Sequence, residues 1–262
     1  MAKFYKYKGN VDLSNISTKR VFLRDLQDLA KDKIWASKLE DLNDPSEGLY
    51  SIDEYYKKLS IGLGFLSKLH FVKTSKDSVN NLKIAENNLL QLKKNIAGIF
   101  SLSKTYDNEL MWSHYSSNHK GYCIEYEFDN LKELNLSRVD MEHYLNHFDD
   151  FVKINYSKKT PEKSLGNEHQ SFINFLSQKS DSWKYEEEYR LILAYFGKYF
   201  INPNIMKSIT FGINSSQKIK NIFICKLQHK DILFYEMERI GNTYNLQRRE
   251  LSTQKINFSP SQ

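Results

Sequence analysis

The chain has 262 residues, and 38 basic against 32 acidic side chains give it a formal net charge of +6. This length predicts one large domain or two small ones and is ample for a buried core. With 40% apolar and 27% charged residues the composition is close to the globular norm, which excludes bulk disorder. We find no apolar run long enough for a transmembrane helix and no secretory signal at the start, so we expect a cytoplasmic protein.

The positive charge could attract nucleic acid, but its make-up weakens that argument. Only seven of the basic residues are arginine and 31 are lysine. Arginine is the side chain that recognises bases and phosphates through two parallel hydrogen bonds. The two cysteines, Cys123 and Cys225, each lie in an apolar, strand-like stretch, so we expect both to be reduced core residues.

The first hundred residues alternate between short strands and helices. Residues 4–8 alternate aromatic and basic side chains, which favours a half-buried strand. A helix capped by Ser17 or Thr18 and ending near residue 30 follows, then a short strand over 33–37. Residues 51–96 are rich in Lys, Asn and Leu with apolar spacing near 3.6, so they predict two helices inserted into the main fold.

The rest of the chain predicts more strands than helices. We expect strands over 98–103, 121–128, 151–156, 186–196 and 207–212, and a C-terminal hairpin formed by 232–238 and 243–251. We expect helices over 108–117, 139–150, 168–180 and 215–221, and a loop over 161–167. The regular alternation of a doubly wound fold is absent. The fold class predicted is α+β, a mixed and mainly antiparallel sheet with a helical insertion, in one domain over 1–252 with a tail over 253–262.

Three clusters of residues could carry chemistry. The first is the segment Asn43-Asp44-Pro-Ser-Glu47, which is either a structural turn or a loop whose Asp44 and Glu47 face a pocket. The second begins with Ser101 and Ser103, which share one face of their strand because side chains alternate there.

This second cluster continues on the following helix. Trp112, Tyr115 and His119 are three and four residues apart, so they share a helix face and could form a stacking wall. Alternatively, Trp112 and Tyr115 are core residues, and His119 caps the helix before Gly121.

The third cluster is Trp183-Lys-Tyr-Glu186-Glu-Glu188-Tyr-Arg190. If the strand begins near Glu186, then Glu186 and Glu188 lie on one face, about 7 Å apart. Mutual repulsion would raise the pKa of one of them, and a carboxylate can stabilise an oxocarbenium-like sugar centre. The alternative is a solvated strand start in which a glutamate pairs with Arg190 or a nearby lysine.

Other chemistries have little support in the sequence. There is no glycine-rich phosphate loop and no CxxC motif. His143 and His147 have the i, i+4 spacing of helical metal ligands, but no third ligand is obvious, so we predict no metal site.

The order of these motifs resembles a bacterial family of unknown function, domain-of-unknown-function family 2971. The resemblance covers about residues 4–213. It rests on Tyr5-Lys-Tyr7, Asn43-Asp-Pro with Glu47, Ser101-x-Ser103, Leu110-Met-Trp-x-His-Tyr with His119 and Gly121, and Trp183-x-x-Glu-x-Glu-Tyr-Arg190.

A more distant resemblance is to the ADP-ribosyltransferases, which suggests a split sheet and NAD as substrate. It implies that Lys6 or Tyr7 holds NAD and that Ser101 and Ser103 position its nicotinamide end. It also implies that Glu188 stabilises the oxocarbenium ion while Glu186 activates the acceptor. The sequence departs from that family in having Lys where the first strand carries Arg or His, and Leu102 between the two serines.

The resulting hypothesis is an NAD-dependent ADP-ribosyltransferase, a glycosyltransferase that modifies RNA, DNA or protein. As a bacterial toxin or antiphage defence effector, it could have partner proteins from a toxin–antitoxin or defence operon. The expected catalytic residues are Glu188, Glu186 and His119. The expected NAD-binding residues are Lys6, Tyr7, Asn43, Asp44, Glu47, Ser101, Ser103, Trp112, His114, Tyr115 and Arg190.

Two other functions stay open at this point. One is a non-catalytic defence module that binds a nucleotide or a partner. The other is a nucleic-acid-binding, nuclease-like protein in which His114, His119, Tyr115 and Glu188 act as acid and base. For the enzyme hypothesis we expect Ser101, Trp112, His119, Glu188 and Arg190 to converge on one pocket.

Overall fold

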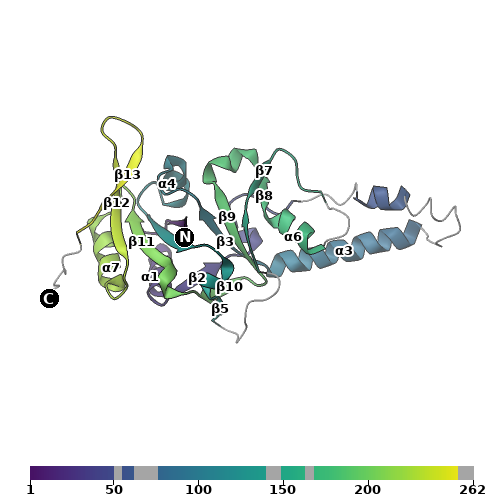
Figure 1. The fold of residues 1–262 in the computed structure, drawn as a ribbon, viewed down its shortest axis with the longest axis horizontal. Coiled ribbons are helices and arrows are strands. Elements are labelled where there is room, and N and C mark those ends of the chain that lie inside the picture. The colour runs from purple at the N-terminus through teal and green to yellow at the C-terminus, as the bar shows by residue number, and fades with distance from the viewer. Residues whose placement is uncertain (50–54, 62–75, 140–148, 163–167, 253–262) are drawn as a thin grey trace.

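The structure is a computed structural model, and it describes residues 1–49, 55–61, 76–139, 149–162 and 168–252. Its centre is an eight-stranded sheet (Figure 1), and the predicted α+β class is confirmed. The order of the strands across this sheet is β13 (Leu246–Glu250), β12 (Leu233–Arg239), β11 (Met206–Phe211), β4 (Tyr122–Phe128), β1 (Ala2–Lys8), β3 (Gly98–Ser103), β9 (Glu188–Leu193) and β6 (Asp150–Lys153). Neighbouring strands are antiparallel except for β11 and β12, which are parallel.

The sheet is nearly divided between β1 and β3. Strand β1 pairs with β4 along its whole length, from Ala2↔Phe128 to Lys8↔Tyr122, and β3 pairs with β9 from Gly98↔Leu193 to Ser103↔Glu188. Among the described residues, β1 and β3 share only the pair Tyr5↔Ser103. Beyond that pair the two strands diverge, so a gap opens in the middle of the sheet.

Alternation along the strands gives the sheet two different faces. One face forms the larger core, in which Phe22 of α1 (Ile16–Ala30) and Phe223 of α7 (Gln217–Leu227) pack on Ile124 and Phe211. The other face carries Tyr5, Tyr7 and Cys123, which pack against Trp112 of α4 (Glu109–Tyr115). Asn15 and Asn108 cap α1 and α4 by accepting hydrogen bonds from the backbone N–H groups of their first turns.

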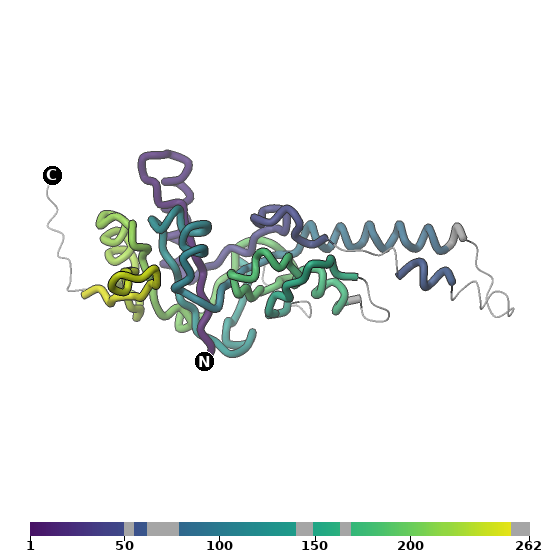
Figure 2. Tube along the Cα trace, turned by 90° about the horizontal axis from the view of Figure 1, so that it is seen from above, coloured from purple at the N-terminus to yellow at the C-terminus, as the bar shows by residue number. Residues whose placement is uncertain are grey.

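The insertion is helical, as predicted. Residues 55–61 and α3 (Lys76–Ile96) form helices, and α3 extends away from the sheet (Figures 1 and 2). Several apolar side chains on α3 are exposed, including Leu82 at 58% and Leu92 at 63%. In the described part of the chain, no helix combines the length and the apolar character needed to cross a membrane. The 21 residues of α3 would be long enough, but they are rich in Lys and Asn.

The remaining elements surround the sheet. Two smaller sheets contain β2 (Lys33–Ala36), β10 (Gly197–Phe200) and β5 (Ser137–Arg138), and β7 (Asn155–Ser157) and β8 (Gln178–Ser180). The remaining helices are α5 (Leu131–Leu134), α6 (Glu168–Leu176) and the 3-10 helices η1 (Leu39–Asp41), η2 (Asp181–Glu186) and η3 (Pro203–Ile205).

Most sequence predictions of elements are confirmed, and several are wrong in part. The first helix is capped by Asn15 and not by Ser17 or Thr18. The strand expected over 151–156 is divided into β6 and β7, which belong to different sheets. The helix expected over 168–180 ends at Leu176, because residues 178–180 pair with β7 instead. The last helix runs to Leu227, well beyond residue 221. Cys123 is buried as expected, but Cys225 is exposed because it lies on the outer side of α7. The predicted helix over 139–150, His143 and His147, most of the predicted loop over 161–167 and the tail over 253–262 lie outside the described residues.

Candidate active site

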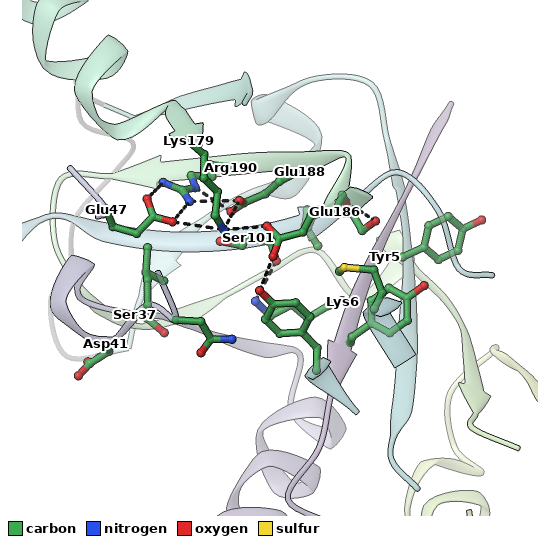
Figure 3. A pocket seen from close by; sticks show the side chains of 17 residues that line it. Tyr5, Lys6, Ser37, Asp41, Glu47, Ser101, Lys179, Glu186, Glu188 and Arg190 are labelled. Atoms are coloured by element: carbon green, nitrogen blue, oxygen red, sulfur yellow. Dashed lines mark hydrogen bonds and ion pairs between the residues drawn. The ribbon is translucent and has the colours of Figure 1, made fainter. Parts of the chain in front are cut away.

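A cavity of about 190 Å³ lies at the gap between β1 and β3 (Figure 3). Its walls combine charged groups with tyrosine rings. The charged residues come from β1, η1 and the loop after it, β8, η2 and β9. They meet here because β9 begins beside the split. The charged side chains lining it are Lys6, Asp41, Glu47, Lys179, Glu186, Glu188 and Arg190.

Arg190 is the centre of this charged cluster. Its side chain is fully buried on β9, where the guanidinium donates two hydrogen bonds to Glu47, at 2.8 and 2.5 Å. It donates two more to Glu188, at 2.7 and 3.1 Å, and a fifth to the carbonyl of Leu176 at 2.8 Å. The donors of the guanidinium fork are thus directed at two carboxylates and a carbonyl, an arrangement that lysine could not reproduce.

Lys179 is a site residue that the sequence analysis missed. It lies on β8, and its ammonium is 2.7 Å from Glu186 and 3.3 Å from both Glu188 and Glu47. The three carboxylates therefore share two cations, Lys179 and Arg190. No local pattern around Gln178–Ser180 marks this lysine, because its role depends on contacts that only the fold creates.

Glu188 begins β9 and is 4% exposed. Burial raises its pKa, but Arg190, Lys179 and a hydrogen bond from the Ser101 hydroxyl outweigh burial and hold the pKa at about 2. The carboxylate is therefore ionised at neutral pH. Ser101 and Glu188 lie on adjacent strands at the edge of the split, since Ser101 pairs with Arg190 and Ser103 with Glu188.

Glu186 does not lie on the strand, so the prediction that it shares a strand face with Glu188 is wrong. It ends the 3-10 helix η2, and Glu187 adopts a left-handed conformation with φ of 43° before β9 begins. This turn directs both Glu186 and Glu188 into the cavity (Figure 3). Burial raises the pKa of Glu186, which Lys179 opposes, and its carboxylate accepts a hydrogen bond from the hydroxyl of Tyr115.

The segment Asn43–Glu47 forms part of the cavity wall. Asn43 and Glu47 line the cavity, and Asn43 hydrogen-bonds to Tyr115. Asp44 instead accepts a hydrogen bond from the backbone N–H of Ser46 at 2.9 Å and is buried. Of the two acidic residues in this segment, Glu47 therefore faces the charged cluster while Asp44 holds the turn.

Lys6 and Tyr7 alternate on β1 and point to opposite faces of the strand. Tyr7 packs on Trp112 in the smaller core and donates a hydrogen bond to the carbonyl of Thr105 at 3.0 Å. Lys6 reaches across the split, where its amine donates to the carbonyl of Ser101 at 2.8 Å. Both residues line the cavity.

Besides Asp44, four expected site residues lie outside the cavity lining or serve the fold. Trp112 is fully buried, and its indole N–H donates to the carbonyl of Tyr106 at 2.7 Å. His119 stacks on Trp112 in a left-handed turn after α4, and the residue that caps this helix is Ser116, not His119 as the alternative interpretation proposed. His114 hydrogen-bonds to the hydroxyl of Tyr185 at 2.9 Å, on the surface. Ser103 lines the cavity, but its hydroxyl donates to the backbone carbonyl of Glu186 at 2.7 Å.

The expected convergence of five residues therefore holds for three of them. Ser101, Glu188 and Arg190 meet in the cavity, while Trp112 and His119 lie behind its wall. Trp112 is held away because α4 buries one of its faces in the smaller core. The prediction that His119 shares that helix face is wrong, because α4 ends at Tyr115 and His119 lies in the turn beyond it.

In comparison with known proteins, part of the chain matches a family model. Residues 111–191 match a family described as a protein of unknown function (DUF2971). This confirms the predicted resemblance over the segment from α4 to β9. The DUF2971 segment supplies Tyr115, Lys179, Glu186, Glu188 and Arg190, while Lys6, Glu47 and Ser101 come from outside it. No curated protein and no solved structure matches the chain.

Proposed function

We propose that the protein binds NAD with the nicotinamide ribose in the cavity and transfers ADP-ribose to a macromolecular acceptor. The observation that carries this proposal is the position of Glu188, an ionised carboxylate at the edge of a split sheet, hydrogen-bonded by Ser101. Departure of nicotinamide leaves positive charge on the ribose carbon. A carboxylate already fixed and ionised beside that carbon stabilises the charge without having to reorganise.

Glu186 supports the second half of the reaction. As the acceptor attacks the ribose carbon it must lose a proton, and the base that takes the proton needs a pKa near the working pH. Burial raises the pKa of Glu186 toward that range, whereas its neighbour Glu188 is held far below it. Two carboxylates with separated pKa values suit a division into proton acceptor and charge stabiliser.

The size of the cavity limits how NAD could bind. Pockets that enclose drug-sized ligands measure about 300–1,000 Å³, and this one is about 190 Å³. It therefore suits the nicotinamide ribose, while the adenosine half would lie outside the mouth. Tyr5, Tyr7 and Tyr115 line the cavity and could contact the flat nicotinamide ring.

Nicotinamide release from NAD by the purified protein tests the proposal. We expect release by the wild type, and a loss of about 100-fold or more in Glu188→Gln, because the stabilising charge is removed. Glu187→Gln is the matched control, since Glu187 is the exposed neighbour of the two site glutamates. Parallel reactions with RNA, DNA and protein extract identify the acceptor from the additive that accelerates release. The net charge of +6 favours a nucleic acid.

One feature of the site favours a second function, a non-catalytic module that binds a nucleotide. Both oxygens of Glu188 already interact with Arg190 and Lys179, so the carboxylate is paired before any ligand arrives. Calorimetry separates the two functions. NAD binding without nicotinamide release would support the module. Absence of both binding and release would refute NAD as the ligand.

A further inference from the structure

Lys6 differs in its surroundings from the other cations of the cavity. Its amine donates to the carbonyl oxygen of Ser101 at 2.8 Å and lies 4.9 Å from the centre of the Phe100 ring. Among the described residues, no carboxylate lies within ion-pair distance of it. By contrast Lys8, two residues further along β1, is 3.2 Å from Asp25, and Lys179 contacts three carboxylates.

The charges around Lys6 do not compensate for its burial. Lys8 and Arg190 repel the ammonium form, while Glu188 and Glu186 attract it across the cavity. Lys6 also lines a second cavity, of about 30 Å³, which Asp25, Asp28 and Lys33 border. Burial is the largest effect, and together these groups lower the pKa of Lys6 to about 7. A large fraction of Lys6 is therefore a neutral amine at physiological pH, with a lone pair that can attack.

We propose that Lys6 is a nucleophilic amine that forms an imine with a small hydroxyaldehyde entering the cavity. The cavity is open to such a molecule, and Lys6 is part of its lining. Ser37, Asp41 and Asn43 also line it and offer hydrogen-bond partners for hydroxyl groups. This reaction needs no NAD, so it stands or falls independently of the transferase activity.

The reaction is a simple condensation. The amine nitrogen of Lys6 attacks the aldehyde carbon, the carbonyl oxygen takes up a proton, and a carbinolamine results. Loss of that oxygen as water leaves a carbon–nitrogen double bond to Lys6. Each imine formed releases one molecule of water, and water reverses the reaction, so the adduct is reversible until a reductant is added.

Reductive trapping tests this proposal. The protein is incubated with glycolaldehyde and cyanoborohydride, which transfers hydride to the imine carbon, and labelled sites are mapped after trypsin digestion. A label on Lys6 blocks cleavage there and yields a peptide spanning residues 4–8, while the N-terminal amine falls in the separate peptide 1–3. An exposed lysine with a pKa of about 10.4 has roughly one neutral amine in 2,500 at pH 7. We therefore expect Lys6 to be labelled at least about tenfold faster than Lys8.

The pH profile and two variants complete the test. Labelling of Lys6 should rise to a plateau above about pH 8, whereas labelling of exposed lysines should continue to rise with pH. Lys6→Arg should abolish the fast label, and Lys8→Arg should retain it. If Lys6→Arg fails to fold, the wild-type peptide map still decides. Equal labelling of Lys6 and Lys8, or a rate at Lys6 that still rises above pH 9, would overturn the proposal.

Discussion

At the scale of single residues, Arg190 holds together a cluster of charges that the fold has removed from water. Removing charges from water is costly, and their mutual attraction repays that cost only when geometry and hydrogen bonding are good. Arg190 meets that condition with five hydrogen bonds, four of them to carboxylates. The cluster is therefore more sensitive to loss of its cation than an exposed ion pair would be.

Replacement of this cation is the first prediction. Arg190→Met should lower the free energy of unfolding by about 3–5 kcal/mol, because three buried carboxylates would share Lys179 alone. Arg249→Met is the matched control. Arg249 is 59% exposed and pairs with Glu236 and Glu238, so its loss should change stability by less than about 1 kcal/mol. Urea unfolding measures both, and similar losses in the two variants would contradict the buried cluster.

Acid should weaken the fold through Glu188. Because the pKa of this carboxylate falls from 4.5 to about 2 on folding, the native state binds fewer protons than the unfolded state between these values. The stabilisation that ionised Glu188 contributes to the folded state is complete above about pH 4.5 and is lost as the pH falls toward 2. The stability difference between the wild type and Glu188→Gln should therefore shrink over that range in urea unfolding at successive pH values. Parallel stability curves would show that Glu188 is not held ionised by folding.

At the scale of elements, the turn between α4 and β4 requires a glycine at position 121. A Cβ atom at Gly121 would lie 2.0 Å from the carbonyl oxygen of Lys8 and 2.9 Å from that of Ser116. These are backbone atoms of β1 and of the end of α4, and they cannot move aside as a flexible side chain could. Gly121 thus allows β4 to start close against β1.

Gly121→Ala should therefore lower the free energy of unfolding by about 3 kcal/mol through backbone displacement. Gly241→Ala is a useful comparison, since Gly241 has φ of 52° but nothing lies within 4 Å of the added methyl group. It should cost only about 1 kcal/mol of left-handed strain. Thermal or urea unfolding of the two variants measures the loss of stability in each. A Gly121→Ala protein as stable as wild type would refute the close contact between Gly121 and the backbone of Lys8 and Ser116.

Some secondary-structure elements could be predicted from the sequence, and others could not. Strands such as 4–8 and 121–128 were predictable because alternation of side chains is a local property that burial on two faces imposes. The break between Glu186 and Glu188 was not, since it rests on a left-handed glutamate where no glycine or asparagine marks the turn. Lys179 could not be found for a similar reason, because its three partners are brought to it by three other segments.

At the scale of the whole molecule, Ser101, Glu188 and Arg190 were correctly grouped because strand neighbours and a split sheet bring their motifs together. Trp112 and His119 were wrongly grouped with them. The spacing of these residues predicts a shared helix face only if the helix continues to His119, but α4 ends at Tyr115. Spacing also does not show that the face carrying Trp112 turns to a core rather than to the cavity. The single-domain prediction over 1–252 remains a prediction.

The two halves of the sheet are interleaved along the chain. One half contains β1, β4, β11, β12 and β13, and the other contains β3, β9 and β6, so the backbone passes from one to the other four times. The segment 111–191 contains β4 and most of β9 but lacks β1 and β3, the two strands that lie between them. Expressed as an isolated fragment, it would have no continuous ladder from β4 to β9. The segment that matches the family therefore depends on the first hundred residues, because β1 and β3 connect its strands into one sheet.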